Sequence, residues 1–275
     1  MRSWELTGLE FRALCADHTE GRLPRPLVFT SSIRWADEYE WELSKTARDL
    51  RGRYNGELDA FGVALAKPDV FVSLQAFGGD GDFDNPEVRT RVHACRQRAR
   101  GFVITQRPGE TVHHAAGFDI VECDPHALGD IVLSRIPFAR AGRLPDTAIP
   151  DTTRDPRFEP GYSTSGSMIS DYDEDENENE NAGNEYDRAL TFLRTSAVRS
   201  GSIRVVQGRS KYGPRGRVEM GMLWRDVEGD GRYAIPMHHP SPSARGMGTE
   251  GLTEWIDEQV DLVVARLDRN MEIEE

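Results

Sequence analysis

The chain lacks long apolar runs and is poor in cysteine. No stretch of its 275 residues reaches transmembrane length, and the first residues, Met1 to Glu5, do not begin the apolar core of a signal peptide. The three cysteines are widely spaced and form no Cys-x-x-Cys pair. This spacing disfavours a disulfide scaffold or a thiolate zinc site and favours buried free thiols. We therefore expect a soluble, cytoplasmic protein.

Familiar catalytic motifs are also missing. The sequence has no Gly-x-Ser-x-Gly elbow, phosphate-binding loop, dinucleotide fingerprint or His-Glu-x-x-His pair. The histidines of His113-His114 and of His238-His239 point to opposite faces if they lie on strands, so neither pair chelates one ion by itself. Cys123 and His126 resemble a nucleophile pair, but Asp124-Pro125 between them already fits a helix start. We expect no metal and no cofactor, and a binding protein rather than an enzyme; a hydrolase with a Cys/His site is the alternative.

Lysine is scarce, with only three among 34 basic residues, and the acids outnumber the bases at 47. The net charge of −13 makes nucleic acids and anionic membranes poor partners. The acidity is concentrated, since residues 171–187 contain nine acids and no base. Residues 150–183 are too polar to offset the entropy of ordering, which predicts a disordered acidic linker. Residues 1–149 and 184–275 are then expected to be the two halves of a single domain.

Hydrophobic periodicity predicts an α+β protein. In the first half, helices are expected from Thr7, over 35–54, over 58–65 and over 124–136. Strands are expected over 27–29, 70–76, 102–104, 112–116 and 118–121, while 88–96 fits a strand or a short helix. In the second half the pattern predicts a helix over 186–197, a strand over 203–206, a hairpin over 217–235 and a final helix from Thr249 to Leu267.

The hairpin over 217–235 has the clearest alternation. Met220, Met222 and Trp224 fall on one face of its first strand, and Glu219, Gly221 and Leu223 fall on the other. If the methionine face is exposed, it offers an adaptable apolar surface to a partner. If that face belongs to the core, the other three residues would contact the partner instead. The sequence leaves both alternatives open.

Two segments repeat one order of elements. Residues 57–136 and 186–268 each read helix, strand, glycine-rich loop, strands and helix. This order predicts a central, mostly antiparallel sheet built from two pseudo-twofold-related halves. Helices, including a C-terminal helical part, are expected to flank the sheet.

Several short segments, in their order and spacing, give the chain a family resemblance. They are Trp4-Glu5-Leu6-Thr7, Leu23-Pro24-Arg25-Pro26-Leu27, Leu65-Ala66-Lys67-Pro68, Arg100-Gly101-Phe102-Val103-Ile104, Leu133-Ser134-Arg135-Ile136-Pro137, and Trp224-Arg225-Asp226 leading to Gly231-Arg232-Tyr233. With these segments the chain resembles the EspG family, the cytosolic chaperones associated with ESX (type VII) secretion in actinobacteria. It departs from the family in its long acidic insert over 150–183.

The resemblance implies a chaperone that grips the tip of the PPE protein in a PE–PPE heterodimer and keeps it soluble for secretion. It implies a binding surface made by the loop Gly78–Pro86, the strand Val218–Trp224 and the helix Thr249–Leu267, and it leaves a homodimer open. An apolar tip needs a receptor patch rimmed by charge. The expected partner-binding residues are Asp80, Asp82, Phe83, Glu219, Met220, Gly221, Met222, Leu223, Trp255 and Glu258.

Overall fold

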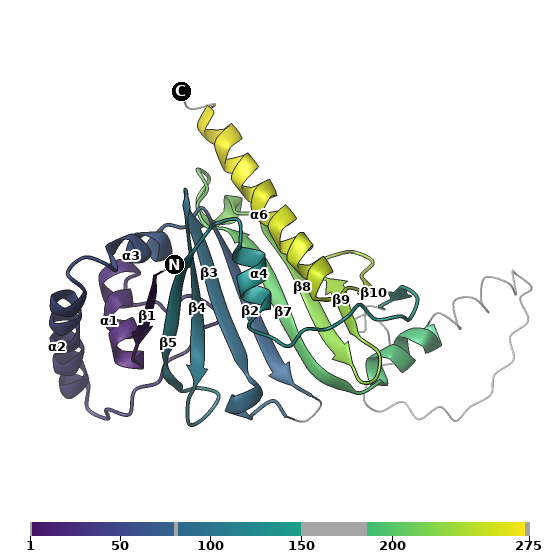
Figure 1. Ribbon diagram of the computed structural model, residues 1–275, viewed down its shortest axis with the longest axis horizontal. Helices are drawn as coiled ribbons and strands as arrows, with labels where there is room; N and C mark the ends of the chain where they lie inside the picture. Colours follow the sequence, from purple (N-terminus) through teal and green to yellow (C-terminus); the bar gives the residue numbers. More distant parts are fainter. Residues whose placement is uncertain (1, 80–81, 150–185, 273–275) are drawn as a thin grey trace, which may run out of the picture.

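A single ten-stranded sheet organises the protein (Figure 1). The computed structural model describes residues 2–79, 82–149 and 186–272. The strands are β1 (Ser3–Leu6), β2 (Val70–Gly78), β3 (Thr90–Gln97), β4 (Arg100–Pro108), β5 (Ala115–Cys123), β6 (Thr147–Ala148), β7 (Ala197–Gln207), β8 (Glu219–Val227), β9 (Arg232–Pro236) and β10 (Ser243–Gly246). Their order across the sheet is β1-β5-β4-β3-β2-β7-β8-β9-β10-β6, and neighbouring strands pair antiparallel.

Helices lie on both faces of this sheet. They are α1 (Gly8–His18), α2 (Ala36–Tyr54), α3 (Asp59–Ala66), α4 (Leu128–Leu133) and α6 (Thr249–Glu272), together with a helical segment over residues 186–194. Thr7 starts α1 with a capping box, because its hydroxyl accepts from Glu10 N at 3.2 Å while the Glu10 carboxylate accepts from Thr7 N at 2.8 Å. At the end of α2, Asn55 takes the left-handed conformation, with φ 42°.

The two halves of the chain meet at the centre of the sheet. There β2 pairs with β7 from Val70↔Gln207 to Gly78↔Arg199. Strands β3, β4 and β5 extend from β2 to one side, and β8, β9 and β10 extend from β7 to the other. In the chain, helix α4 follows β5 and helix α6 follows β10. These two helices pack together on one face of the sheet (Figure 1). The predicted antiparallel sheet in two related halves is confirmed, while the predicted linker over 150–183 lies outside the described residues.

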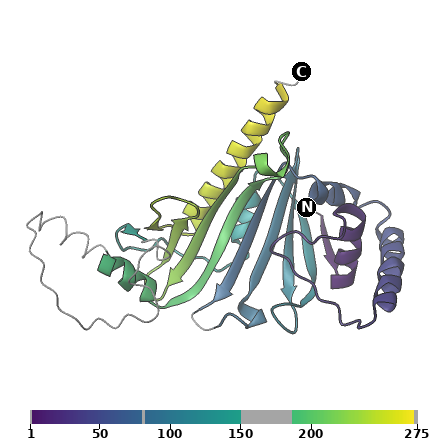
Figure 2. The ribbon, with the colours of Figure 1, turned by 180° about the vertical axis from the view of Figure 1, so that it is seen from behind.

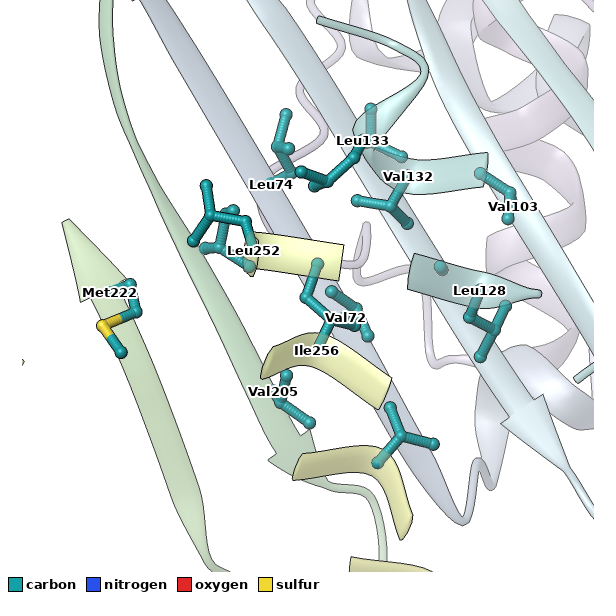
Figure 3. Close-up of a cluster of buried hydrophobic side chains, with 14 of the residues drawn as sticks. Val72, Leu74, Val103, Leu128, Val132, Leu133, Val205, Met222, Leu252 and Ile256 are labelled. Atoms are coloured by element: carbon teal, nitrogen blue, oxygen red, sulfur yellow. The ribbon is translucent and has the colours of Figure 1, made fainter. Parts of the chain in front are cut away.

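One face of the sheet is closed by α4 and α6. Val72 and Leu74 of β2 and Val205 of β7 lie opposite Leu252 and Ile256 of α6 (Figure 3). Alternation along each strand supplies this apolar layer: β2 reads buried, intermediate, buried from Val70 onward. At Gly201 a side chain is excluded, because an added Cβ would lie 2.7 Å from the indole of Trp224. We call this side the covered face.

The opposite face is covered only in part. Helices α1 and α3 pack on β1, β5, β4 and part of β3, and α2 lies outside them (Figure 2). This second core contains Phe11, Phe61, Phe102, Phe118 and Ile120, all buried. Within the described ranges, the 186–194 helix reaches this face only at Arg225 of β8 and Tyr233 of β9, and no helix covers it over β2, β7 and the first part of β8 (Figure 2). We call that region the open face.

In the β8–β9 hairpin, the segments Trp224-Arg225-Asp226 and Gly231-Arg232-Tyr233 make contacts within the fold. The Arg232 guanidinium, fully buried, donates to both carboxylate oxygens of Asp226 at 2.6 and 2.9 Å and to Pro137 O at 3.1 Å. It also lies 4.6 Å from the ring of Trp224. Arg225 donates to backbone carbonyls at the end of the 186–194 helix, including Leu193 O at 3.1 Å. These contacts fix the hairpin from within, as expected for residues that do not meet a partner.

Several sequence predictions of elements are wrong in extent. Residues 27–29 form no strand, because Val28 N donates to the Gln106 side chain at 2.8 Å instead of to a strand. The two short strands predicted over 112–116 and 118–121 are one, β5, and 88–96 becomes the strand β3. The helix predicted from 124 begins only at Leu128, since Asp124 instead accepts from His126 N in a turn. Strands β1, β6 and β10 were missed because they have only two to four residues each.

Candidate functional site

The open face carries several polar side chains at the centre of the sheet. Side chains from three adjacent strands point to it: Phe71, Ser73 and Gln75 from β2, Ser202, Arg204 and Val206 from β7, and Glu219 and Leu223 from β8. They lie in paired rows, such as Gln75↔Ser202↔Leu223. Most of them are half-buried, unlike the alternate residues beneath the helices.

A groove of about 560 Å³ runs over this face. Its floor is formed by the β2 and β7 residues just named, and one wall is formed by the segment after α1 together with the end of α3. That wall is apolar, with Pro24, Pro26, Val28 and Leu65. A hollow with apolar walls and a few polar groups is the usual form of a binding site in proteins.

The charged lining of the groove is predominantly basic. Arg25, Arg91, Arg204 and Arg217 line it together with a single acid, Glu219. Arg204 pairs with Glu219 at 2.7 Å across β7 and β8. The groove is thus locally positive in a chain with net charge −13, which makes it complementary to an acidic partner group.

Two buried titratable groups border the groove. The ring Nδ1 of His93 lies 2.8 Å from Arg25 O, and burial lowers the pKa of His93 to about 4, so the ring is neutral at pH 7. Because the carbonyl only accepts, Nδ1 carries the hydrogen. Burial, with Arg89 nearby, lowers the pKa of Arg91 to about 10, which still leaves its guanidinium charged.

The structure decides which side of β8 is accessible. Met222 is only 9 % exposed and Trp224 is buried, both under α6, and Met220 packs against the same core. The prediction that Met220 and Met222 face a partner is corrected on this point, because strand alternation places them on the covered face. Gly221 lies on the opposite face, in register with Arg204, but is buried there: an added Cβ would lie 2.7 Å from the Met237 sulfur.

On the other side of β8, two predicted residues are accessible. Leu223 is 44 % exposed, and the side chain of Glu219 lies at the rim of the groove. They are the residues that the sequence offered as the alternative. Both belong to the open face.

The loop after β2 also borders the open face. Phe83 is 51 % exposed, and its ring meets that of Phe77 edge-on at 6.2 Å between centroids. Arg89 donates to Phe83 O at 2.7 Å, and Asn85 donates to the carboxylate of Asp82 at 3.2 Å, so the loop is held by its own contacts. Asp80 lies outside the described residues.

The predicted residues of α6 lie on the far side of the sheet. Trp255 and Glu258 line a second groove of about 530 Å³ with Phe138 and Met247, at the N-terminal end of α6. The ten predicted residues therefore do not form one surface. Phe83, Glu219 and Leu223 lie along the open face, with Phe83 beside Phe77 and Glu219 in the row of Phe71, whereas Trp255 and Glu258 belong to the covered side.

Sequence reasoning missed the groove residues of β2, β3 and β7. Ser73, Gln75, Ser202 and Arg204 occupy alternate positions of two strands whose other positions are apolar over 70–76 and 201–205. Polar residues at every second position of a strand in the middle of a sheet indicate a face without a helix upon it. That signal was present in the sequence. To use that signal, one must know that β2 and β7 lie at the centre of the sheet.

The Cys/His alternative finds no support in the geometry. Burial, followed by the charges of Asp124 and Glu122, raises the pKa of the Cys123 thiol to about 11, the opposite of what an activated nucleophile needs. Burial likewise raises the pKa values of Cys15 and Cys95 to about 12. Over the described ranges, no three His, Cys, Asp or Glu side chains are arranged to hold a metal ion.

None of the helices within the described ranges combines the length and apolar character that a membrane crossing requires.

The fold defines an α+β protein with an antiparallel sheet closed on one face and grooved on the other. The sequence profile of the EspG family matches residues 7–249, and the chain belongs to that family. A search of curated proteins finds no match in sequence. Among solved structures the fold is similar to the Mycobacterium tuberculosis type VII secretion system chaperone EspG5, determined in complex with a PE25–PPE41 dimer: 12% identity, TM-score 0.53, covering 96% of each chain.

Proposed function

We propose that this protein is a cytoplasmic, non-enzymatic chaperone that binds a PE–PPE heterodimer through the tip of its PPE subunit and keeps it soluble for type VII (ESX) secretion. Membership of the EspG family and the likeness to a chaperone solved with a PE–PPE dimer support the class of partner. The observation that carries the proposal is the open face, a grooved sheet surface that no described helix covers. Residues 150–183 are proposed to connect the two halves of one domain.

The partner surface is proposed to be the open face with its adjacent loop. Leu223 and Phe83 supply exposed apolar side chains there, and Glu219 and Arg204 supply charge at the rim. Exposed apolar side chains beside charged and polar groups are the composition expected of a specific interface. Helix α6 then supports this surface from behind, because its inward side chains pack under β2, β7 and β8.

Co-expression with a PE–PPE pair tests the proposal, with the ternary complex detected by size-exclusion chromatography and its Kd measured by calorimetry. Leu223→Asp places a charge in the centre of the interface, and we expect binding at least about 30-fold weaker. Leu262→Asp is the matched control, since Leu262 is 59 % exposed on α6. It should bind as the wild type does.

Two outcomes would contradict the proposal. If the wild-type chain forms no complex with any PE–PPE pair, the chaperone function fails. If Leu262→Asp abolishes the complex while Leu223→Asp binds normally, the partner sits on the α6 side instead of the open face.

A further inference from the structure

Arg91 is a buried cation that the fold does not neutralise. It lies on β3 opposite Gln75 of β2, lines a small hollow with Gln106 of β4, and is only 7 % exposed. Its Nε has no hydrogen-bond partner among the described residues, and no carboxylate there forms an ion pair with it. The neighbouring Gln106 amide is already engaged, because its oxygen accepts from Val28 N at 2.8 Å and its nitrogen donates to His114 O at 3.4 Å.

The Nε of Arg91 is therefore removed from water without a described partner, while the side chain lines the groove. Buried charges are normally paired or hydrogen-bonded, because desolvation without compensation is expensive. Here the lowered pKa of Arg91 reflects burial and the repulsion of Arg89, with no acid acting in the opposite sense. Arg232, the other deeply buried arginine, is by contrast held by Asp226 on two sides. Asp226 neutralises Arg232, whereas no acid among the described residues does the same for Arg91.

The surroundings of Arg91 indicate what would neutralise it. It lines the open-face groove, in which the only acid, Glu219, is already paired with Arg204. His93 beside it is neutral and has its Nδ1 occupied by Arg25 O. A planar guanidinium presents parallel N–H groups that match a carboxylate, and this pairing strengthens when both are removed from water.

We propose that Arg91 is an anion-recognition residue of the groove and binds the carboxylate of an Asp or Glu side chain that the partner inserts over Ser73 and Gln75. The apolar walls accept the neighbouring side chains of that partner segment, and the carboxylate replaces the compensation that Arg91 lacks in the free chain. This inference rests on the proposed function, since it names the chemistry by which the same surface recognises its partner.

Arg91→Met separates recognition from folding, because it keeps the length of the side chain and removes the charge. For a recognition residue we expect partner binding to weaken at least about 30-fold, while the Tm of the free protein stays equal or rises. Arg91→Lys keeps the charge but loses the two-pronged geometry. Its affinity for the partner should lie between those of the wild type and Arg91→Met. Arg51→Met, at an exposed arginine of α2 paired with Asp17, is the control and should bind normally.

A second readout does not require the PE–PPE pair. In protein labelled with ¹⁵N-arginine, the Nε–H resonance of Arg91 is assigned by its loss in Arg91→Met and followed during titration with sodium acetate. We expect a saturable shift with acetate and none with sodium chloride at equal ionic strength. This shift persists even if no PE–PPE pair binds, so failure of the chaperone function and failure of the anion site are distinguishable.

Three results would overturn the proposal. The first is an Arg91→Met variant that binds like the wild type, or that loses Tm and affinity together as a structural residue would. The second is an Arg91 resonance that responds neither to acetate nor to the partner. The third is a shift of that resonance on deletion of residues 171–187, with their nine acids, because the chain itself would then supply the carboxylate.

Discussion

The two faces of the central sheet are built from the same strands and yet differ in almost every physical property. On β2, Val72 and Leu74 are fully buried under α6, while Ser73 and Gln75 line a groove. Each face also has an arginine–acid pair. Arg232–Asp226 is buried on the covered face, and Arg204–Glu219 is half-exposed on the open face.

The comparison shows that one face maintains the fold and the other is available for recognition. Removing groups from the covered face leaves cavities or unpaired charge, so their loss affects stability. Removing groups from the open face returns their surroundings to water, so their loss affects binding. The following substitutions test this division.

The largest effect is expected from the buried ion pair. Asp226→Ala leaves Arg232 charged and fully buried, and should lower the free energy of unfolding by about 3–5 kcal/mol. Glu219→Ala, which removes the open-face pair, should cost no more than about 1 kcal/mol. Urea denaturation of both variants measures the difference. Equal losses would contradict the division between the faces.

A neighbouring pair of residues on β2 gives the next largest contrast. Leu74→Ala removes a fully buried side chain and should cost about 2–5 kcal/mol through lost transfer energy and the remaining cavity. Gln75→Ala, one residue along and on the open face, should change stability by no more than about 0.5 kcal/mol. Thermal or urea unfolding of the two variants is the measurement. A costly Gln75→Ala would mean that the open face is packed after all.

His93 provides a smaller, pH-dependent effect. Its pKa in the folded state, about 4, lies below the ordinary value of 6.5, so the unfolded chain binds this proton first as pH falls. The stability that neutral His93 contributes is present above pH 6.5 and is lost between pH 6.5 and 4. From pH 7 to pH 5 the loss should be on the order of 2 kcal/mol.

His93→Asn isolates this contribution. Asparagine keeps a donor for Arg25 O but does not titrate, so the variant should lose less stability than the wild type over the same pH interval. Urea unfolding at pH 7, 6 and 5 gives the two slopes. Parallel curves would show that His93 is not responsible for the difference.

Much of the fold could be predicted because it depends on local patterns. The capping box at Thr7, the apolar stripe of α6 and the alternation on β8 each follow from residues close together in the sequence. The repeated order of elements then gave the antiparallel sheet. Short strands such as β1 and β10, at four residues each, have too few residues for a pattern of their own.

The site was less predictable, because a surface depends on what other segments cover. Leu223 and Met222 are adjacent in sequence, and only the position of α6 buries one and exposes the other. Trp255 and Phe83 were both reasonable partner contacts, but the sheet separates them. Arg91 gave no signal, since it reads as an ordinary polar residue of a strand.

By itself, the sequence determined the strands, the helices and the side chains that alternate on each face, because periodicity and capping act over a few residues. Only the tertiary structure decided which of the two alternating faces became the core. That choice depends on where α4 and α6 pack, and it requires contacts between residues as distant as Leu74 and Leu252. The same packing left the groove open and left Arg91 without a carboxylate partner among the described residues. Neither feature follows from a local sequence pattern.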